Sequence, residues 1–174
     1  MRHPFWSVPL LLLALAACGE RSSGSEPGSD VPLLTFETSE VRLVGSGGDT
    51  LTLRVEVAAT AEQRALGLME RSSLAEDAGM LFIYRGEQPG EAGYWMFHTR
   101  IPLDIAYLDA EGRIVAIRAM EPCESPDPRW CPAYPPEVPY HAALEANSGY
   151  FSRHGIAVGD RVLLPDPASL PTPE

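Results

Sequence analysis

Six side chains of this sequence have the chemistry of a ligand-binding site. A tryptophan ring can stack on a flat ligand, an arginine and a histidine can carry positive charge, and a threonine and two carboxylates can exchange hydrogen bonds with ligand hydroxyl groups. This mixture is typical of a pocket for a small molecule or a glycan. The six candidate residues are Arg64, Trp95, His98, Thr99, Asp104 and Glu145.

Each of these residues also has a structural interpretation. Arg64 could form an ion pair with Glu145 or with Asp104. Trp95 could fill the core, and His98 could lie at the end of a strand. Polar residues in apolar strands are usually hydrogen-bonded parts of the fold. Asp104 is the clearest case, because the apolar residues around it require a charge partner, a backbone hydrogen bond or an exposed edge.

No catalytic residue is predicted, because the motifs of the common enzyme classes are missing. The sequence has no G-x-S-x-G nucleophile elbow, no H-E-x-x-H zinc motif and no G-x-G-x-x-G loop after a strand. It has no lysine, which excludes Schiff-base chemistry. The alternative to a non-catalytic binding domain is a hydrolase or transferase for envelope glycans, with Asp104, Glu145 and His98 as acid, base or electrostatic groups. No metal or cofactor is expected.

The first residues predict export from the cytoplasm. Arg2 supplies positive charge, residues 5–14 are apolar, and residues 15–18 read Leu-Ala-Ala-Cys, the pattern of a bacterial lipobox. A lipobox is cleaved before its cysteine, so residues 1–17 would be the signal peptide and Cys18 the lipidated N-terminus. The apolar run is shorter than the about 20 residues that a membrane-spanning helix needs. An uncleaved anchor or an ordinary secretory signal is the alternative.

The lipobox also predicts where the protein works. A lipidated Cys18 would hold the protein on a membrane through its acyl chains. Gly19 follows the cysteine in place of an aspartate, which favours the outer membrane of a Gram-negative cell, with the domain facing the periplasm. A small ligand, a glycan or an envelope protein would then be the second partner.

Residue composition divides the mature chain into three parts. Residues 18–31 are rich in glycine, serine and charge, which predicts a flexible tether. Residues 165–174 contain four prolines and no periodic pattern, so a disordered tail is expected. Residues 32–164 are long enough for one domain with its own core.

The balance of charge argues against a nucleic acid partner. The chain carries 24 acidic residues and 13 basic ones, for a formal net charge of -11. All 13 basic residues are arginines, and they are scattered along the sequence. A surface that binds phosphates needs clustered cations, so we expect no binding to nucleic acid.

The cysteines predict one disulfide bond. If Cys18 carries lipid, Cys123 and Cys131 remain as a pair in an oxidising compartment. They lie in a proline-rich segment, whose fixed φ angles indicate an irregular but rigid loop. A redox-active or metal-binding pair is the alternative, but the spacing is not Cys-x-x-Cys.

The hydrophobic pattern places the candidate residues on or near short strands. Apolar and polar residues alternate over 51–57, and the glycine-rich turn 45–49 predicts a hairpin with 40–44. Thr60 and Gln63 resemble a capping box, which predicts a helix over 61–70. Further strands are predicted at 80–84, 94–98, 101–108, 113–119, 140–146 and 161–164, with a helical turn at 150–154. This order predicts an α+β fold, a compact and mainly antiparallel β domain with one or two short helices, whose sheet could close partly into a barrel.

A series of short motifs resembles one protein family. They include Gly-Leu-Met at 67–69, Gly-Met-Leu-Phe at 79–82, Trp-Met at 95–96, Ile-Pro-Leu-Asp-Ile at 101–105, Ala-Leu-Glu at 143–145 and Val-Gly-Asp-Arg-Val at 158–162. In this order they resemble the domain-of-unknown-function family numbered 192, here as a lipoprotein. The resemblance implies a small mixed sheet domain, often exported, and no settled activity. After Trp-Met the family usually has Lys-Asn, whereas this chain has Phe97 and His98, so its ligand or affinity could differ.

Overall fold

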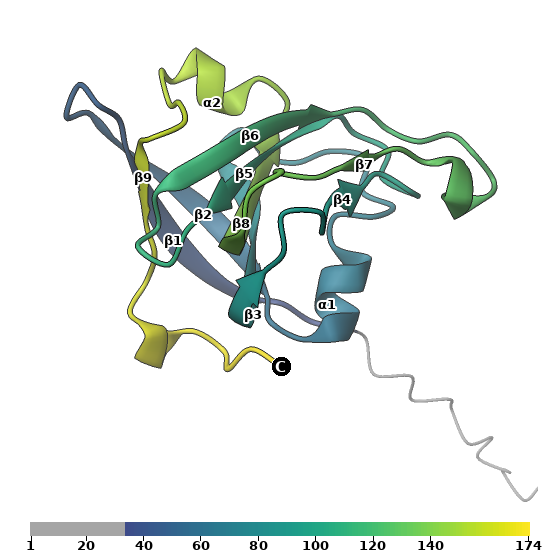
Figure 1. Cartoon of the computed structure of the whole chain (residues 1–174), viewed down its shortest axis with the longest axis horizontal. Helices are drawn as coiled ribbons and strands as arrows, with labels where there is room; N and C mark the ends of the chain where they lie inside the picture. The colour runs from purple at the N-terminus through teal and green to yellow at the C-terminus, as the bar shows by residue number, and fades with distance from the viewer. Residues whose placement is uncertain (1–33) are drawn as a thin grey trace, which may run out of the picture. The chain divides into compact units, whose positions relative to one another are not determined.

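A curled sheet of seven strands forms the centre of the domain (Figure 1). The computed structural model describes residues 34–174, so the predicted signal peptide, Cys18 and the tether lie outside the described residues. The strand order along the sheet is β6-β5-β8-β3-β2-β1-β9. The strands are β1 (Glu37–Val44), β2 (Thr50–Ala58), β3 (Ala78–Gln88), β5 (Leu103–Leu108), β6 (Ile114–Met120), β8 (Tyr140–Asn147) and β9 (Arg161–Leu163).

Short elements complete the fold. β4 (Tyr94–Trp95) and β7 (Ala133–Tyr134) form a separate sheet of two strands. The helices are α1 (Ala61–Leu66) and α2 (Tyr150–Arg153), and 3-10 turns lie at Pro128–Trp130 and Pro167–Ser169. The predicted α+β class, with a mainly antiparallel sheet and short helices, is confirmed.

β1 and β2 form the predicted hairpin. Their register pairs Val41 with Leu53 and Leu43 with Leu51, so the alternate apolar residues of both strands face the same side. β2 then pairs in parallel with β3. Parallel neighbours need a crossover connection, and the segment that contains α1 supplies it. This crossover is the reason that α1 comes to lie beside the sheet.

The two ends of the sheet meet and partly close it into a barrel. The Ile114 N–H at the start of β6 donates to the Asp160 carbonyl over 2.8 Å, and the Val162 N–H of β9 donates to the Gly112 carbonyl over 2.8 Å. An isolated antiparallel bridge joins the same two segments. Gly112 is required here, because a Cβ atom at this position would lie 2.3 Å from the Val162 carbonyl oxygen. The sheet therefore forms the partly closed barrel that the strand pattern suggested.

Two apolar cores lie on the two faces of the sheet. The core inside the curl takes side chains from all seven strands and from α2, among them Leu43, Leu81, Leu144 and Phe151. The core on the outer face is formed by β3, β5, β6 and β8, with Leu68 and Met96 packed over it. Because side chains alternate along each strand, successive residues contribute to different cores. The outer core borders the candidate site.

Two predicted elements are much shorter than expected, the helix because Gly67 has a positive φ and the strand because its partner β7 is only two residues long. The helix expected over 61–70 ends at Leu66, where Gly67 has a φ of 50° and its N–H donates to the Gln63 carbonyl. The predicted capping box of this helix, with Thr60 as its N-cap, is confirmed. The strand expected over 94–98 ends at Trp95, and His98 has a φ of 56°. Positive φ interrupts the regular geometry of both helices and strands.

The C-terminal segment packs against the domain, which corrects the expectation of a disordered tail. Leu170 packs against the inner core. The Glu174 N–H donates to the Ala59 carbonyl over 3.0 Å, and the Arg85 side chain donates to the Pro173 carbonyl over 2.9 Å. Composition could not reveal these contacts, because their partners lie far away in the sequence.

The predicted disulfide bond is formed. Cys123 and Cys131 are bonded, with their Cα atoms 5.6 Å apart. The bond closes a loop that carries the 3-10 turn and Trp130, which is 79% exposed. The Cys123 N–H donates to the Met96 carbonyl over 3.2 Å. The loop is thereby tied to the segment that follows β4, which carries two of the predicted site residues.

Candidate functional site

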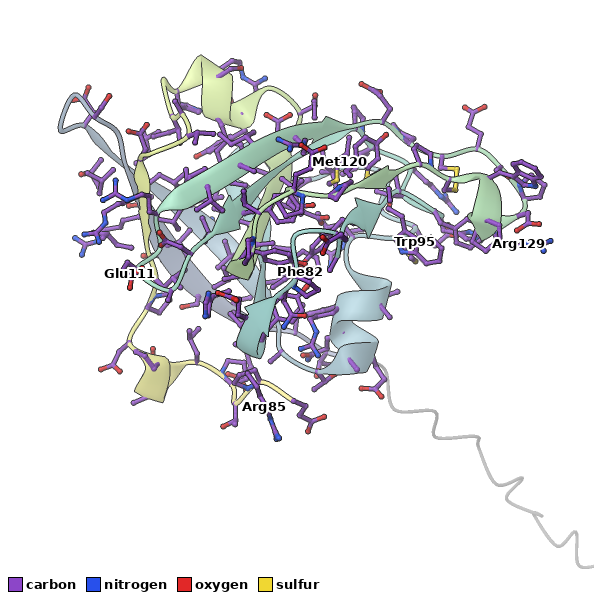
Figure 2. All side chains as sticks on the ribbon, in the orientation of Figure 1. Phe82, Arg85, Trp95, Glu111, Met120 and Arg129 are labelled. Atoms are coloured by element: carbon purple, nitrogen blue, oxygen red, sulfur yellow. A yellow bond between two sulfur atoms is a disulfide. The ribbon has the colours of Figure 1, made fainter. Side chains whose placement is uncertain are left out.

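A narrow pocket on the outer face of the sheet brings four of the six predicted residues together. Arg64 lines it from α1, Trp95 from β4, Thr99 from the loop that follows and Glu145 from β8. Phe82 of β3 forms part of the wall. Figure 2 shows Phe82 in the middle of the domain and Trp95 nearer to one end, beside β4. The cavity has a volume of about 30 Å³, which is room for about one or two water molecules.

Glu145 contributes a buried carboxyl group without a partner. Leu144 and Ala146 of β8 face the inner core, so Glu145 between them faces the outer side. Glu145 is only 4% exposed. The Glu145 carboxyl group forms no hydrogen bond within residues 34–174. Since every fully buried side-chain nitrogen or oxygen in this range has a partner, the carboxyl oxygens are not fully buried. Its oxygens are therefore open to the pocket.

Burial also decides the charge of this carboxyl group. It raises the pKa of Glu145 to about 8, because the ionised form would lose its hydration and gain no donor in return. At pH 7 the group is therefore mostly protonated. A protonated carboxyl group can donate one hydrogen bond and also accept others. Carboxyl groups with such a raised pKa occur preferentially at functional sites.

Tyrosine rings surround Glu145 on the outer face of the sheet. The hydroxyl groups of Tyr84 and Tyr94 lie 2.5 Å apart, and the Tyr94 ring packs edge-on against Phe82 with centroids 4.9 Å apart. Burial raises the pKa of Tyr94 well above its ordinary value, and the nearby Glu145 raises it further. Burial likewise raises the pKa of Tyr107, with Glu145 again contributing. These rings line strands as ordinary core residues do, so the sequence carries no signal for Tyr84 or Tyr107 as part of a site.

Arg64 is held by backbone carbonyl groups. Its guanidinium group donates to the carbonyls of Ala59, Ile83 and Glu174, the last two over 3.1 and 2.9 Å. Its Cζ atom lies 4.9 Å from the centroid of the Tyr84 ring, a cation–π contact. The expected ion pair with a buried carboxylate is therefore wrong. Arg64 places a positive charge beside the pocket and also ties α1 to β3 and to the C-terminal segment.

Trp95 and Thr99 complete the pocket. Trp95 is 46% exposed and its ring lies 5.7 Å from that of Phe97, so the alternative that it fills the core is wrong. Thr99 is 7% exposed, and its N–H donates to the Met96 carbonyl over 3.1 Å. No hydrogen bond of the Thr99 hydroxyl group is formed within residues 34–174, so this group is also open to the pocket.

His98 borders a second hollow, next to the pocket, and Thr99 lines both. Nδ1 of His98 lies 2.8 Å from Oε1 of Glu70, and the Glu70 N–H donates to the His98 carbonyl over 2.8 Å. Arg100 forms an ion pair with the same carboxylate. The contacts with His98 and then Arg100 lower the pKa of Glu70. Cys123 brings the disulfide loop to the edge of this hollow.

Glu70 and His98 share an unusual backbone conformation. Their φ angles are 62° and 56°. Such conformations cost on the order of 1 to 3 kcal/mol in residues other than glycine and occur preferentially at functional sites. The sequence points to His98 because it departs from the family motif. Glu70 could not be found in this way, since it lies 28 positions from His98 and no motif joins the two.

Asp104 lies on the opposite face of the sheet from Glu145. The register of β5 and β8 pairs Ile105 with Glu145 and Asp104 with Ala146. Neighbouring residues of a strand point to opposite faces, so the two carboxyl groups cannot share a site. The expected set of Asp104, Glu145 and His98 as acid and base groups is therefore not formed, and His98 reaches only the neighbouring hollow.

Asp104 instead supports α2. It is 6% exposed, and the backbone N–H groups of Gly149 and Phe151 lie close enough to its carboxyl group to favour the ionised form. Burial raises the pKa of Asp104, while the Gly149 N–H, the charge of Arg153 and the Phe151 N–H oppose the rise. These are backbone contacts of the kind that the apolar surroundings of Asp104 required.

The described residues were also searched for a metal site and for a membrane-spanning helix. Within residues 34–174, no three His, Cys, Asp or Glu side chains lie close enough together to hold a metal ion. None of the helices in this range is long and apolar enough to cross a membrane.

The fold and the pocket define a small α+β half-barrel domain with a buried carboxyl group on its outer face. The family model of DUF192, described as "Uncharacterized ACR", matches residues 42–164. The chain therefore belongs to the DUF192 family, in agreement with the resemblance of its motifs. None of the curated proteins matches this chain.

The solved structures that are similar to this chain include the following two. One, from Sinorhizobium meliloti 1021, is described as a candidate transcription regulator; it shares 32% identity with a TM-score of 0.66, over 75% of this chain and 95% of that one. The other, from Novosphingobium aromaticivorans DSM 12444, is described as a protein of unknown function; it shares 31% identity with a TM-score of 0.67, over 76% of this chain and 89% of that one.

Proposed function

We propose that this protein is a lipoprotein of the bacterial cell envelope whose domain binds a small ligand without transforming it. Cys18 carries the lipid, and the tether that follows lets the domain work within reach of the membrane. The pocket formed by Arg64, Trp95, Thr99 and Glu145 receives the ligand.

The observation that carries this proposal is the pair of unpartnered polar groups in the pocket. Buried carboxyl and hydroxyl groups normally have hydrogen-bond partners, because each missing bond costs about 1 to 3 kcal/mol. The groups of Glu145 and Thr99 are open to the pocket and form none within residues 34–174. A ligand could supply these hydrogen bonds, and a few well-placed polar groups of this kind are the usual basis of specific recognition in a pocket.

A glycan hydrolase is the second candidate, and the raised pKa of Glu145 favours it. A carboxyl group that stays protonated at neutral pH can serve as a general acid. Glycoside hydrolysis needs a second carboxylate across the scissile bond. Asp104 cannot be that group, because it faces the inner core. Asp104 was the residue expected to supply the second carboxylate. Its place on the other face favours the binding function.

The description of the Sinorhizobium structure as a transcription regulator does not extend easily to this chain. The formal net charge of -11 would repel the phosphates of DNA, and the arginines of the pocket region are engaged with backbone carbonyls or with Glu70.

Nuclear magnetic resonance of the purified protein tests the binding function. A panel of neutral sugars, amines, amides and carboxylic acids is added one compound at a time. We expect at least one class to shift the Gly67 and Thr99 amide signals and the Trp95 indole signal, while the exposed Trp130 indole serves as the internal control and stays unchanged.

If no compound class shifts the pocket signals, the binding function is wrong. If a glycan is cleaved in the same samples, and cleavage stops in the Glu145→Gln variant, the hydrolase replaces it as the function.

A further inference from the structure

We infer that the pocket takes an uncharged hydroxylated ligand of the carbohydrate class, with one hydroxyl or hydroxymethyl group bound between Glu145 and Thr99. This inference rests on the proposed binding function and adds the chemical class of the ligand.

The hydrogen-bonding capacity of the pocket is the first argument. A protonated carboxyl group and a threonine hydroxyl group can each donate one hydrogen bond and also accept one. Glu145 and Thr99 are more than nine-tenths buried, and both are open to the same pocket. A hydroxyl group, which also donates and accepts, can satisfy both partners at once. An ammonium group has no acceptor, and a carboxylate group has no donor.

The charges around the pocket are the second argument. Arg64 of α1 lies beside it and disfavours a cationic ligand, while three of its five N–H groups already donate to backbone carbonyls. The other groups that face Glu145 are Tyr84 of β3, Tyr94 of β4 and Tyr107 of β5, all uncharged. A cationic ligand group would lose its hydration here and meet no anionic partner, and an anionic group would have only the two remaining Arg64 N–H groups.

The size and shape of the site are the third argument. A cavity of about 30 Å³ admits one or two small groups and not a whole sugar ring. The ring would remain outside, where Trp95 is 46% exposed and lies 5.7 Å from the Phe97 ring. Exposed aromatic rings pack against the apolar faces of sugar rings while the hydroxyl groups are bound by polar side chains. Trp95 lines the pocket and thus supplies a stacking surface at its edge.

Titration of the purified protein with sugars of different charge tests this inference. The probes are glucose and N-acetylglucosamine, which are neutral, and glucosamine and glucuronic acid, which are charged at pH 6. The signals of the Thr99 methyl group and the Trp95 indole report binding. We expect a neutral sugar to bind at least tenfold more tightly than its charged counterparts at pH 6.

The binding should also weaken as Glu145 ionises. Neutral sugars do not titrate between pH 6 and pH 9, so a change in affinity reports on the protein. With a pKa of about 8, only about one tenth of Glu145 remains protonated at pH 9, which predicts about tenfold weaker binding. His98, Glu70 and Arg100 border the neighbouring hollow, outside the pocket that Glu145 lines. The Glu145→Gln variant assigns the effect, because the ratio of affinities at the two pH values should fall to about one.

Two variants serve as controls. Glu111→Gln changes an exposed carboxylate away from the pocket and should leave affinity and pH dependence unchanged (Figure 2). Thr99→Val keeps the shape of the side chain and removes its hydroxyl group, so binding of the neutral sugar should weaken about tenfold.

Tighter binding of glucosamine or glucuronic acid than of glucose would overturn the inference. Binding of a different class from the panel of amines, amides and acids, with no effect of any sugar, would overturn it too and would leave the proposed binding function intact. A pocket that binds no compound of any class would instead contradict the proposed function itself.

Discussion

Glu145 is kept neutral by its position on β8. Its two neighbours in the strand belong to the inner core, and tyrosine rings surround it on the outer side. The unfolded chain exposes the same carboxyl group to water, where its pKa returns to the ordinary value of 4.5. Between these two values, the folded state holds a proton that the unfolded state releases.

The stability of the protein should therefore fall as the pH rises from about 5 to about 8. In this window the unfolded state binds fewer protons than the folded state, so the free energy of unfolding decreases with pH. The Glu145→Gln variant, which cannot ionise, should remove this component and be more stable at pH 7 than the wild type, by on the order of 3 kcal/mol. Urea denaturation followed by tryptophan fluorescence at several pH values measures the effect.

The Glu111→Gln variant is the matched control for this prediction. Its carboxylate is exposed, so its stability should follow that of the wild type at every pH. Equal pH dependence in the wild type and the Glu145→Gln variant would contradict a neutral Glu145.

The sequence predicted which kinds of side chain form the pocket. It predicted only in part which of the candidate residues lie together. Arg64, Trp95, Thr99 and Glu145 line one pocket, as a shared site requires. Asp104 has an equally suitable side chain, but the register of β5 and β8 turns it to the other face. Register depends on pairing between distant segments, which one sequence does not reveal.

At the scale of elements, the loop closed by Cys123 and Cys131 supports the site from the side. Cys123 lines the hollow beside His98, and its N–H binds the Met96 carbonyl. A change in this loop should therefore alter the conformation of the segment that carries Thr99.

The double variant Cys123→Ser, Cys131→Ser should be less stable than the wild type. Loss of the disulfide bond restores conformational freedom to the unfolded loop, and a loop of this length predicts a decrease of about 2 kcal/mol in the free energy of unfolding. The Thr99 amide signal should also shift or broaden. Denaturation curves and amide spectra measure both effects, and a variant as stable as the wild type with an unchanged Thr99 signal would refute this role of the loop.

The elements themselves were predictable where local chemistry determines them. Thr60 and Gln63 begin α1 through a capping box, and the turn 45–49 joins the two strands of the hairpin. The end of α1, the end of β4 and the positive φ of His98 were not, because they depend on constraints that come from elsewhere in the fold, such as the two-residue pairing of β4 with β7. The backbone contact of His98 with Glu70 is one such constraint.

For the whole molecule, the proposed lipid anchor determines where the pocket meets its ligand. The Cys18→Ser variant cannot be lipidated, so we expect it to move from the membrane fraction to the soluble fraction of the cell envelope. Fractionation of bacteria that express the wild type or the variant, followed by immunoblotting, measures the distribution. The Cys123→Ser, Cys131→Ser variant is the control and should remain with the membrane. A Cys18→Ser protein that still fractionates with membranes would contradict the anchor.

The position of β8 in the sheet has a consequence for the timing of folding. β8 lies between β5 and β3, and within the seven-stranded sheet it alone pairs with both. Until residues 140–147 are available, β1–β3 and β5–β6 share no strand pairing. Contacts between such distant segments also form slowly. In a protein secreted from its N-terminus, this arrangement would delay completion of the sheet, and of the pocket that contains Glu145, until most of the chain has crossed the membrane.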